Sequence, residues 1–148
     1  MESSKEVLWL ENQICFPLYA VSRMVTQLYT PLLNQLDITY PQYLVLLVLW
    51  KEDQRSVSEL SSTLFLETNT LTPLLKRLEK KGLLIRQRSE ADERRVEISL
   101  TPKGISLREE ALCIPHKILE ELSDEAISEN EIHQFKNTLS KLLKLMGK

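Results

Sequence analysis

The chain has 148 residues, of which 43% are hydrophobic and 27% charged, and these values suit a globular protein with one hydrophobic core. Its start lacks the basic residues and the apolar stretch of a secretion signal, and the apolar run from Tyr43 to Trp50 is too short to cross a bilayer. Cys15 and Cys113 are too far apart for a CxxC motif and too few for the disulfide framework of a small secreted domain. We therefore expect a cytoplasmic protein with reduced thiols, no metal, no cofactor and no membrane partner.

Charge is unevenly distributed along the chain. The net charge is −2 and the pI is about 5.8, which alone argues against a nucleic-acid-binding protein. Residues 51–104, however, carry 11 Lys and Arg against 9 Asp and Glu, and residues 76–95 carry 8 against 4. A local positive surface can bind phosphate groups even when the whole molecule is slightly acidic.

A long amphipathic helix is predicted near the start of the chain. Its apolar residues recur at alternating spacings of four and three: Ile14, Leu18, Val21, Val25, Leu28 and Leu32. Pro17 lies within this pattern, so the helix is either kinked there or begins near that residue. An apolar stripe of this kind needs a partner surface to cover it.

Three helices are predicted between residues 37 and 82. Thr39 caps a buried helix that contains the run YLVLLVLW. Ser56 and Glu59 form a capping box for a short helix that ends near Thr63. After a turn at FLE, the segment TNTLTPLLKRLEKKG is predicted to be a helix that Gly82 caps at its C-terminus. Its buried face consists of Leu71, Leu74, Leu75 and Leu78.

A β-hairpin and two more helices complete the predicted elements. The runs LLIRQR and VEISLT flank the polar tip SEADER, and apolar residues alternate with polar ones in the second run. Thr101 caps a helix that starts at Pro102, and Pro115 bends or ends it. Ser128 and Glu131 form a capping box for a last helix. Its apolar residues are Ile132, Phe135, Leu139, Leu142 and Met146.

Two short helices, a tight turn and a basic hairpin are the pattern of a winged helix-turn-helix domain. The fold class is therefore mainly α (α+β), with a small β-hairpin wing and with N- and C-terminal helices that form a homodimer interface. Short polar side chains on the second helix suit base edges, and cations suit the DNA backbone. Arginines at the hairpin tip can enter a minor groove, and Asp92 is expected to hold an arginine in position. The candidate DNA-binding residues are Ser56, Thr68, Asn69, Thr70, Thr72, Pro73, Lys76, Arg77, Arg86, Asp92, Arg94 and Arg95.

The hairpin segment DERRVEISLT (92–101) resembles the wing signature of the MarR family of bacterial transcriptional regulators. The segments LENQICFPLYA, LDITYPQYLVLLVLW, LFLETNTLTPLLKRLEKKGLL and RSEADERRVEISLT resemble, more narrowly, its organic hydroperoxide resistance (OhrR) branch. The resemblance covers about residues 8 to 118. It implies a single MarR-type domain over residues 1–148, with a dimerisation region at 1–36 and 102–148 and a DNA-binding region at 37–101. Glu67, Thr68 and Asn69 stand where close relatives often show Asp-Ser-Gly, and Pro17 where Leu is often found.

The resemblance also implies a function and a sensor. It implies a homodimeric repressor on an inverted-repeat operator in double-stranded DNA, released when an organic hydroperoxide oxidises one N-terminal cysteine. The sensing cysteine falls on Cys15, and the tyrosines that hydrogen-bond it fall on Tyr19, Tyr29 and Tyr40. Phenolic hydroxyls can donate to a thiolate, which is the reactive form of cysteine.

Cys15 and Tyr29 cannot touch within one straight helix. They are fourteen residues apart, which is roughly 21 Å along a helix. If two copies of the helix pair antiparallel about a two-fold axis, Cys15 of one chain lies beside Tyr29 of the other. Tyr19, one turn away, is the tyrosine available in the same chain.

Other functions remain open. A MarR-type repressor could instead be released by a small aromatic ligand bound between its dimerisation and winged regions. A cysteine-dependent peroxidase would also use one reactive thiol, but neither His116 nor His133 is an evident base for Cys15. A purely structural interaction module would leave the basic hairpin unexplained.

Cys113 has two interpretations. A buried bystander is favoured, since free cysteine is among the most buried residue types. The alternative is a resolving partner for oxidised Cys15, while a small-molecule thiol is a further candidate for a mixed disulfide.

Overall fold

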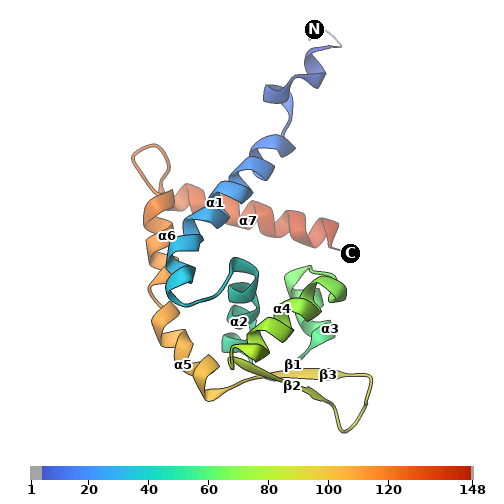
Figure 1. The fold of residues 1–148 in the computed structure, drawn as a ribbon. Helices are drawn as coiled ribbons and strands as arrows, with labels where there is room; N and C mark the ends of the chain where they lie inside the picture. Colours follow the sequence, from blue (N-terminus) through green and yellow to red (C-terminus); the bar gives the residue numbers. More distant parts are fainter. Residues whose placement is uncertain (1–4, 148) are drawn as a thin grey trace.

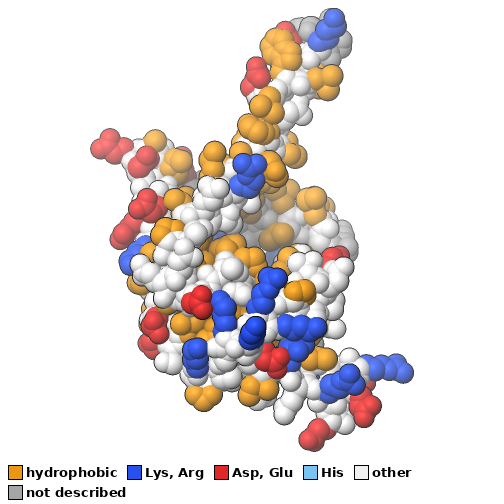
Figure 2. Space-filling model, in the orientation of Figure 1, with side chains coloured by type: hydrophobic (Ala, Val, Ile, Leu, Met, Phe, Trp, Pro, Cys, Tyr) orange, Lys and Arg blue, Asp and Glu red, His pale blue; other side chains and the backbone are white. Residues whose placement is uncertain are grey.

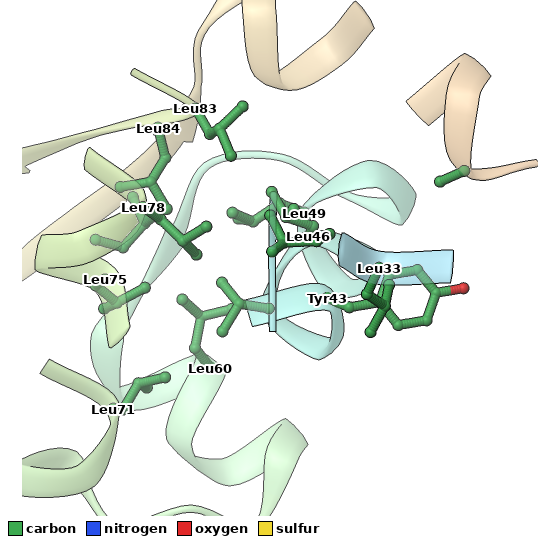
Figure 3. Packing of buried hydrophobic residues seen from close by; sticks show 14 of the residues in the cluster. Leu33, Tyr43, Leu46, Leu49, Leu60, Leu71, Leu75, Leu78, Leu83 and Leu84 are labelled. Carbon is green, nitrogen blue, oxygen red and sulfur yellow. The ribbon is translucent and has the colours of Figure 1, made fainter. Parts of the chain in front are cut away.

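Helix α2 (Tyr40–Lys51) is the centre of the hydrophobic core in the computed structural model, which describes residues 5–147. Thr39 caps its start as predicted, and Gln42 completes a capping box that was not predicted. Tyr43, Val45, Leu46 and Leu49 are all buried. Figure 3 shows Leu46 and Leu49 among leucines of the following elements, with Tyr43 at the edge of the cluster beside Leu33.

The helix-turn-helix follows α2. Helix α3 (Val57–Leu64) begins at the predicted capping box of Ser56 and Glu59, and α4 (Thr68–Lys80) buries Leu71, Leu75 and Leu78 against the core. Gly82 follows α4 with φ +74°, the left-handed conformation that favours glycine at a helix end. Because α4 already begins at Thr68, Pro73 lies inside the helix and leaves the Asn69 carbonyl without its usual backbone donor.

A three-stranded antiparallel sheet carries the wing. The predicted hairpin is formed by β2 (Leu84–Arg88) and β3 (Val96–Leu100), with Arg88 opposite Val96 at the tip end and Leu84 opposite Leu100 at the base. A two-residue strand, β1 (Arg55–Ser56), adds to the other edge of β3 and was not predicted. The hairpin extends away from the body of the molecule (Figure 1).

The prediction that Pro115 bends or ends the helix after the wing is wrong. Helix α5 (Pro102–Ala111) already stops before Leu112, and Pro115 lies in the first turn of a separate helix, α6 (Ile114–Leu122). Proline is tolerated in a first turn because the N–H it lacks would have no helical partner there. Thr101 caps α5 as expected.

Two long helices near the ends of the described chain carry uncovered apolar residues. Helix α1 (Cys15–Gln35) follows two short 3-10 turns, η1 (Glu6–Leu8) and η2 (Leu10–Asn12), and α7 (Glu129–Met146) starts at the predicted capping box. Pro17 lies in the first turn of α1, so the helix begins near it, whereas Pro31 lies inside the helix, which continues to Gln35. The start of α1 projects from the body (Figure 1), and Figure 2 shows apolar side chains along this projection. The exposed fraction is 88% for Ile14 and 80% for Met146.

The helix-turn-helix and wing confirm the predicted fold class. Within residues 5–147, no helix is both long enough and apolar enough to cross a membrane. The same residues contain no group of three or more His, Cys, Asp or Glu side chains placed to hold a metal ion. The ends of the predicted dimerisation region at residues 1 and 148 lie outside the described residues.

We expect Gly104→Ala to destabilise the fold. A Cβ at this buried position of α5 would overlap the Leu83 carbonyl oxygen and lie 3.2 Å from Leu100 Cδ2, and overpacking of this kind costs about 1–3 kcal/mol. Thermal unfolding followed by circular dichroism should show a lower Tm than in the parent. Ser106→Ala, at an exposed position of the same helix, is the control; equal Tm values for the two variants would contradict the packing.

Candidate functional site

A groove of about 470 Å³ separates the wing from the N-terminal ends of α3 and α4. Seven of the predicted DNA-binding residues line it: Ser56, Thr68, Thr72, Arg86, Asp92, Arg94 and Arg95. Asn69, Thr70, Pro73, Lys76 and Arg77 lie instead on the exposed face of α4, outside the groove. Ser58, an exposed residue that the sequence reasoning missed, also lines the groove. Its position two residues after the Ser56 cap was the available signal.

Acidic residues hold two of the predicted arginines in place. Arg86 donates from Nε to Glu79 Oε2 at 2.8 Å, which ties β2 to α4 and lowers the pKa of Glu79. Arg95 lies 3.3 Å from Glu59, which ties the wing to α3, and 3.6 Å from Glu97 within the wing's own strand β3. The wing therefore has a fixed position beside the helices.

Asp92 was predicted to hold an arginine in position, and it does so through the backbone. Its Oδ1 accepts from the backbone N–H of Arg94 at 3.0 Å, and its carbonyl accepts from the backbone N–H of Arg95 at 2.9 Å. It therefore stabilises the turn at the tip and does not contact a guanidinium group. The Arg94 side chain has no hydrogen bond or ion pair within the described part of the chain.

Ser56 and Thr72 line the groove, and each hydroxyl already makes a hydrogen bond within its own helix or cap. Ser56 is buried, and its Oγ accepts from the backbone N–H of Glu59 at 3.1 Å. The pKa of Glu59 is lowered because its carboxylate accepts in return from the backbone N–H of Ser56. Thr72 Oγ1 donates to the Thr68 carbonyl at 2.9 Å. Exposed groups for a ligand therefore come mainly from Thr68, Asn69 and the free cations.

Cys15 is the first residue of α1 and is exposed. Its predicted neighbour Tyr19 is also exposed, and the Tyr19 hydroxyl accepts from Arg23 Nη1 at 3.4 Å, with the Arg23 guanidinium 5.2 Å from the ring centroid. Within residues 5–147 the Cys15 sulfur makes no hydrogen bond. The described chain alone thus leaves Cys15 without a hydrogen-bonding tyrosine.

Tyr29 and Tyr40 come together at the other end of α1, with ring centroids 4.8 Å apart. Tyr43, which the sequence reasoning missed, completes the cluster at 5.9 Å from Tyr29 and 6.4 Å from Tyr40. Its position one helical turn after Tyr40 was the available signal. Burial raises the pKa of Tyr40 and Tyr43, and burial with the neighbouring tyrosines raises that of Tyr29 to about 12. These phenols therefore remain protonated hydrogen-bond donors at neutral pH.

Cys113 lies between α5 and α6, and the expectation that it is buried is wrong for the described chain. Its thiol is exposed, and Sγ donates to the Glu110 carbonyl at 3.8 Å. The helix break at Leu112 places it outside the core. An exposed thiol is available to a second thiol.

Comparison with known proteins identifies the family. The family model for SarA/Rot transcriptional regulators matches residues 27–111. The organic hydroperoxide resistance transcriptional regulator of Bacillus subtilis (strain 168) is 49% identical, over 99% of this chain and 97% of that protein. The chain belongs to the MarR family of transcriptional regulators, in its OhrR branch. The wing signature and the quoted segments thus indicated the family correctly.

Solved structures of the regulator AbfR, a protein of Staphylococcus epidermidis, are similar over nearly the whole OhrR-type chain. Reduced AbfR bound to DNA gives a TM-score of 0.79 at 35% identity, covering 99% of this chain and 100% of that one. Overoxidized AbfR bound to DNA gives 0.74 at 37% identity, covering 97% and 99%. Disulfide-formed AbfR gives 0.65 at 38% identity, covering 97% of each.

We expect Tyr29→Phe to change the stability of this regulator at alkaline pH. A folded-state pKa of about 12 against about 10 in the unfolded chain means that the fold favours the neutral phenol. The resulting contribution to the free energy of unfolding is fully present below pH 10 and is lost as the pH rises from about 10 to about 12. Urea unfolding across this range should therefore show a smaller loss in the variant than in the parent. An equal loss in both would contradict the shift.

Proposed function

We propose that this chain is a redox-sensing repressor that binds an inverted-repeat operator as a homodimer and leaves it when an organic hydroperoxide oxidises Cys15. The observation that carries this proposal is the distance along α1 between the exposed Cys15 and the cluster of Tyr29 and Tyr40. A thiol and its hydrogen-bond donors that cannot meet in one chain can meet in two. On this proposal the protein acts on DNA in the cytoplasm, and its role is regulatory, not catalytic.

A second copy of the chain would also cover the exposed apolar ends. A groove of about 530 Å³ runs between the start of α1 and α7, lined by apolar residues that include Leu18, Val21, Phe135 and Leu142. Several apolar side chains of these two helices remain exposed in the single chain. Burial of such surface contributes about 25 cal/mol per Å², so pairing of these ends supports a stable dimer.

The proposed oxidation proceeds by attack of the Cys15 thiolate on the peroxide. A sulfur–oxygen bond forms, the peroxide O–O bond breaks, and the alkoxide takes a proton and leaves as an alcohol. The sulfenic acid adds an oxygen acceptor beside the donors Tyr29 and Tyr40 of the other subunit. The rearranged tyrosines would then change the spacing of the two α4 helices away from the roughly 34–36 Å repeat of successive major grooves.

Cys113 supports a second scheme for the step after sulfenic acid. Its exposed thiol can attack oxidised Cys15 of the other subunit, so that a disulfide forms and water leaves. AbfR has a solved disulfide form, and its overoxidized form is bound to DNA. These two AbfR structures support a disulfide as the form of the protein that leaves the operator. A small-molecule thiol attacking the same sulfenic acid would give a mixed disulfide and water instead.

We expect Cys15→Ser to bind the operator as tightly as the parent and to ignore peroxide. The measurement is a gel shift on an inverted-repeat duplex selected in vitro, with and without cumene hydroperoxide. The parent should lose about 10- to 100-fold in affinity, because only its Cys15 can be oxidised at the proposed site. Release of Cys15→Ser by peroxide would overturn the sensor.

Cys113→Ser is the matched control for the same experiment. Release of this variant by peroxide shows that sulfenic acid or a small thiol is sufficient. Loss of release, together with a covalent dimer of the parent on non-reducing electrophoresis, supports the disulfide scheme. Peroxide-insensitive release by an aromatic ligand, or sustained peroxide turnover, would favour the ligand-driven repressor or the peroxidase.

We expect Arg94→Ala to weaken operator binding by the reduced protein. Its unpaired guanidinium at the wing tip is available to DNA, and loss of one phosphate or groove contact should reduce the slope of log affinity against log salt by about 1. Lys117→Ala removes an exposed cation of α6, remote from the groove, and should leave the slope unchanged. Equal slopes for the parent and Arg94→Ala would contradict a role for this arginine.

A further inference from the structure

Tyr43 connects the sensor tyrosines to the core. It is only 3% exposed, and its ring packs on both Tyr29 and Tyr40. Figure 3 shows that it lies at the margin of the leucine cluster, with its hydroxyl directed away from Leu46 and Leu49. Interiors are close-packed, so a displacement of either neighbour is passed to this ring.

The next contact lies two helical turns along α2. The ring of Tyr43 meets the indole of Trp50 edge to face, with centroids 6.3 Å apart and an interplanar angle of 68°. This geometry is favourable for aromatic pairs. Both residues belong to one helix, so the contact follows α2 from the sensor end toward the wing.

Trp50 then contacts the start of α5. Its Nε1–H donates to the Gly104 carbonyl at 2.9 Å, a hydrogen bond between residues 54 positions apart. Gly104 is buried against Leu83 and Leu100, close enough that a Cβ would not fit. The indole therefore binds the part of α5 that packs on the wing.

Leu83 connects this contact to both DNA-facing elements. Its N–H donates to the Leu78 carbonyl at 3.1 Å, which completes the end of α4, and its carbonyl accepts from the N–H of Thr101 at 3.1 Å, which closes the base of the wing. A shift of Gly104 would thus act on α4 and on the hairpin together.

The rings also have space to move. An open cavity of about 360 Å³ lies beside them, lined by Tyr43 and Trp50 on α2 and by Ala111 and Pro115 on α5 and α6. A water molecule occupies about 30 Å³ of liquid, so this volume is enough for the displacement of an aromatic ring.

We propose that Trp50 is a positioning residue that couples the sensor tyrosines to the wing through Tyr43 and Gly104. The inference rests on the proposed function, because it needs Tyr29 and Tyr40 to rearrange on oxidation. Their movement displaces Tyr43 toward the cavity, the indole follows, and the hydrogen bond to Gly104 is lost. The base of the wing and the end of α4 then lose one of the contacts that hold them in the DNA-binding arrangement.

The first test is Trp50→Phe, which retains an aromatic ring and removes the N–H donor. The quantity measured is the ratio of operator dissociation constants with and without cumene hydroperoxide. We expect this ratio to fall about tenfold from that of the parent, within the range of ordinary allosteric coupling. Trp9→Phe, which makes the same side-chain change at the other, exposed tryptophan, is the matched control and should keep the ratio of the parent. An unchanged ratio in Trp50→Phe would overturn the proposal.

The second test leaves the hydrogen bond from Trp50 to Gly104 intact. The chain has two tryptophans, so Trp9→Phe leaves Trp50 as the only indole emitter. Its emission should shift when cumene hydroperoxide is added and should not shift in Trp9→Phe combined with Cys15→Ser. Release from DNA with no change in Trp50 emission would overturn the coupling alone. A peroxide response that survives Cys15→Ser would instead overturn the proposed sensor.

Discussion

The separation of Cys15 from the tyrosine cluster along α1 determines how this regulator can work. The helix is continuous from Cys15 to Gln35, and fourteen residues of helix keep the thiol roughly 21 Å from Tyr29. A helix is stiff over this length, so no local movement can bring them together. If Cys15 is the sensor, dimerisation and assembly of the sensor are therefore the same event, and any change at the thiol is felt by both subunits.

The molecule has one part that encloses its own hydrophobic core and another part whose apolar residues need a partner surface. The helix-turn-helix and wing enclose their own leucine core, in which Leu46, Leu60 and Leu78 are fully buried. The start of α1 and the end of α7 leave their apolar residues exposed. Helix α2 belongs to both parts, because its leucines form the core while Tyr40 and Tyr43 contact α1. It is the element through which a change at the dimerisation helices can reach the DNA-binding surface.

Local signals allowed most of the fold to be predicted, and long-range contacts account for what was missed. Capping boxes at Ser56 and Ser128 and the glycine at 82 act within one turn, so the sequence shows them directly. Strand β1 has two residues and shows no periodicity, and the break before Cys113 separates α5, which packs on α2 and β3, from α6, which packs on α1. The role of Asp92 in the turn could not be distinguished from an ion pair, since both need only a nearby carboxylate.

The ion pairs of the wing explain why an acidic protein can present a positive DNA-binding face. Of the eight cations in residues 76–95, the ion pairs of the described chain involve Lys81, Arg86 and Arg95. The wing arginines Arg86 and Arg95 pair with Glu79, Glu59 and Glu97, whereas Asp37 pairs with Lys81 beyond the end of α4. Carboxylates that lower the net charge thus fix the wing against α3 and α4, and the remaining cations stay free on the surface. Net charge alone therefore does not predict whether such a surface is positive, because it does not show which charges are already paired.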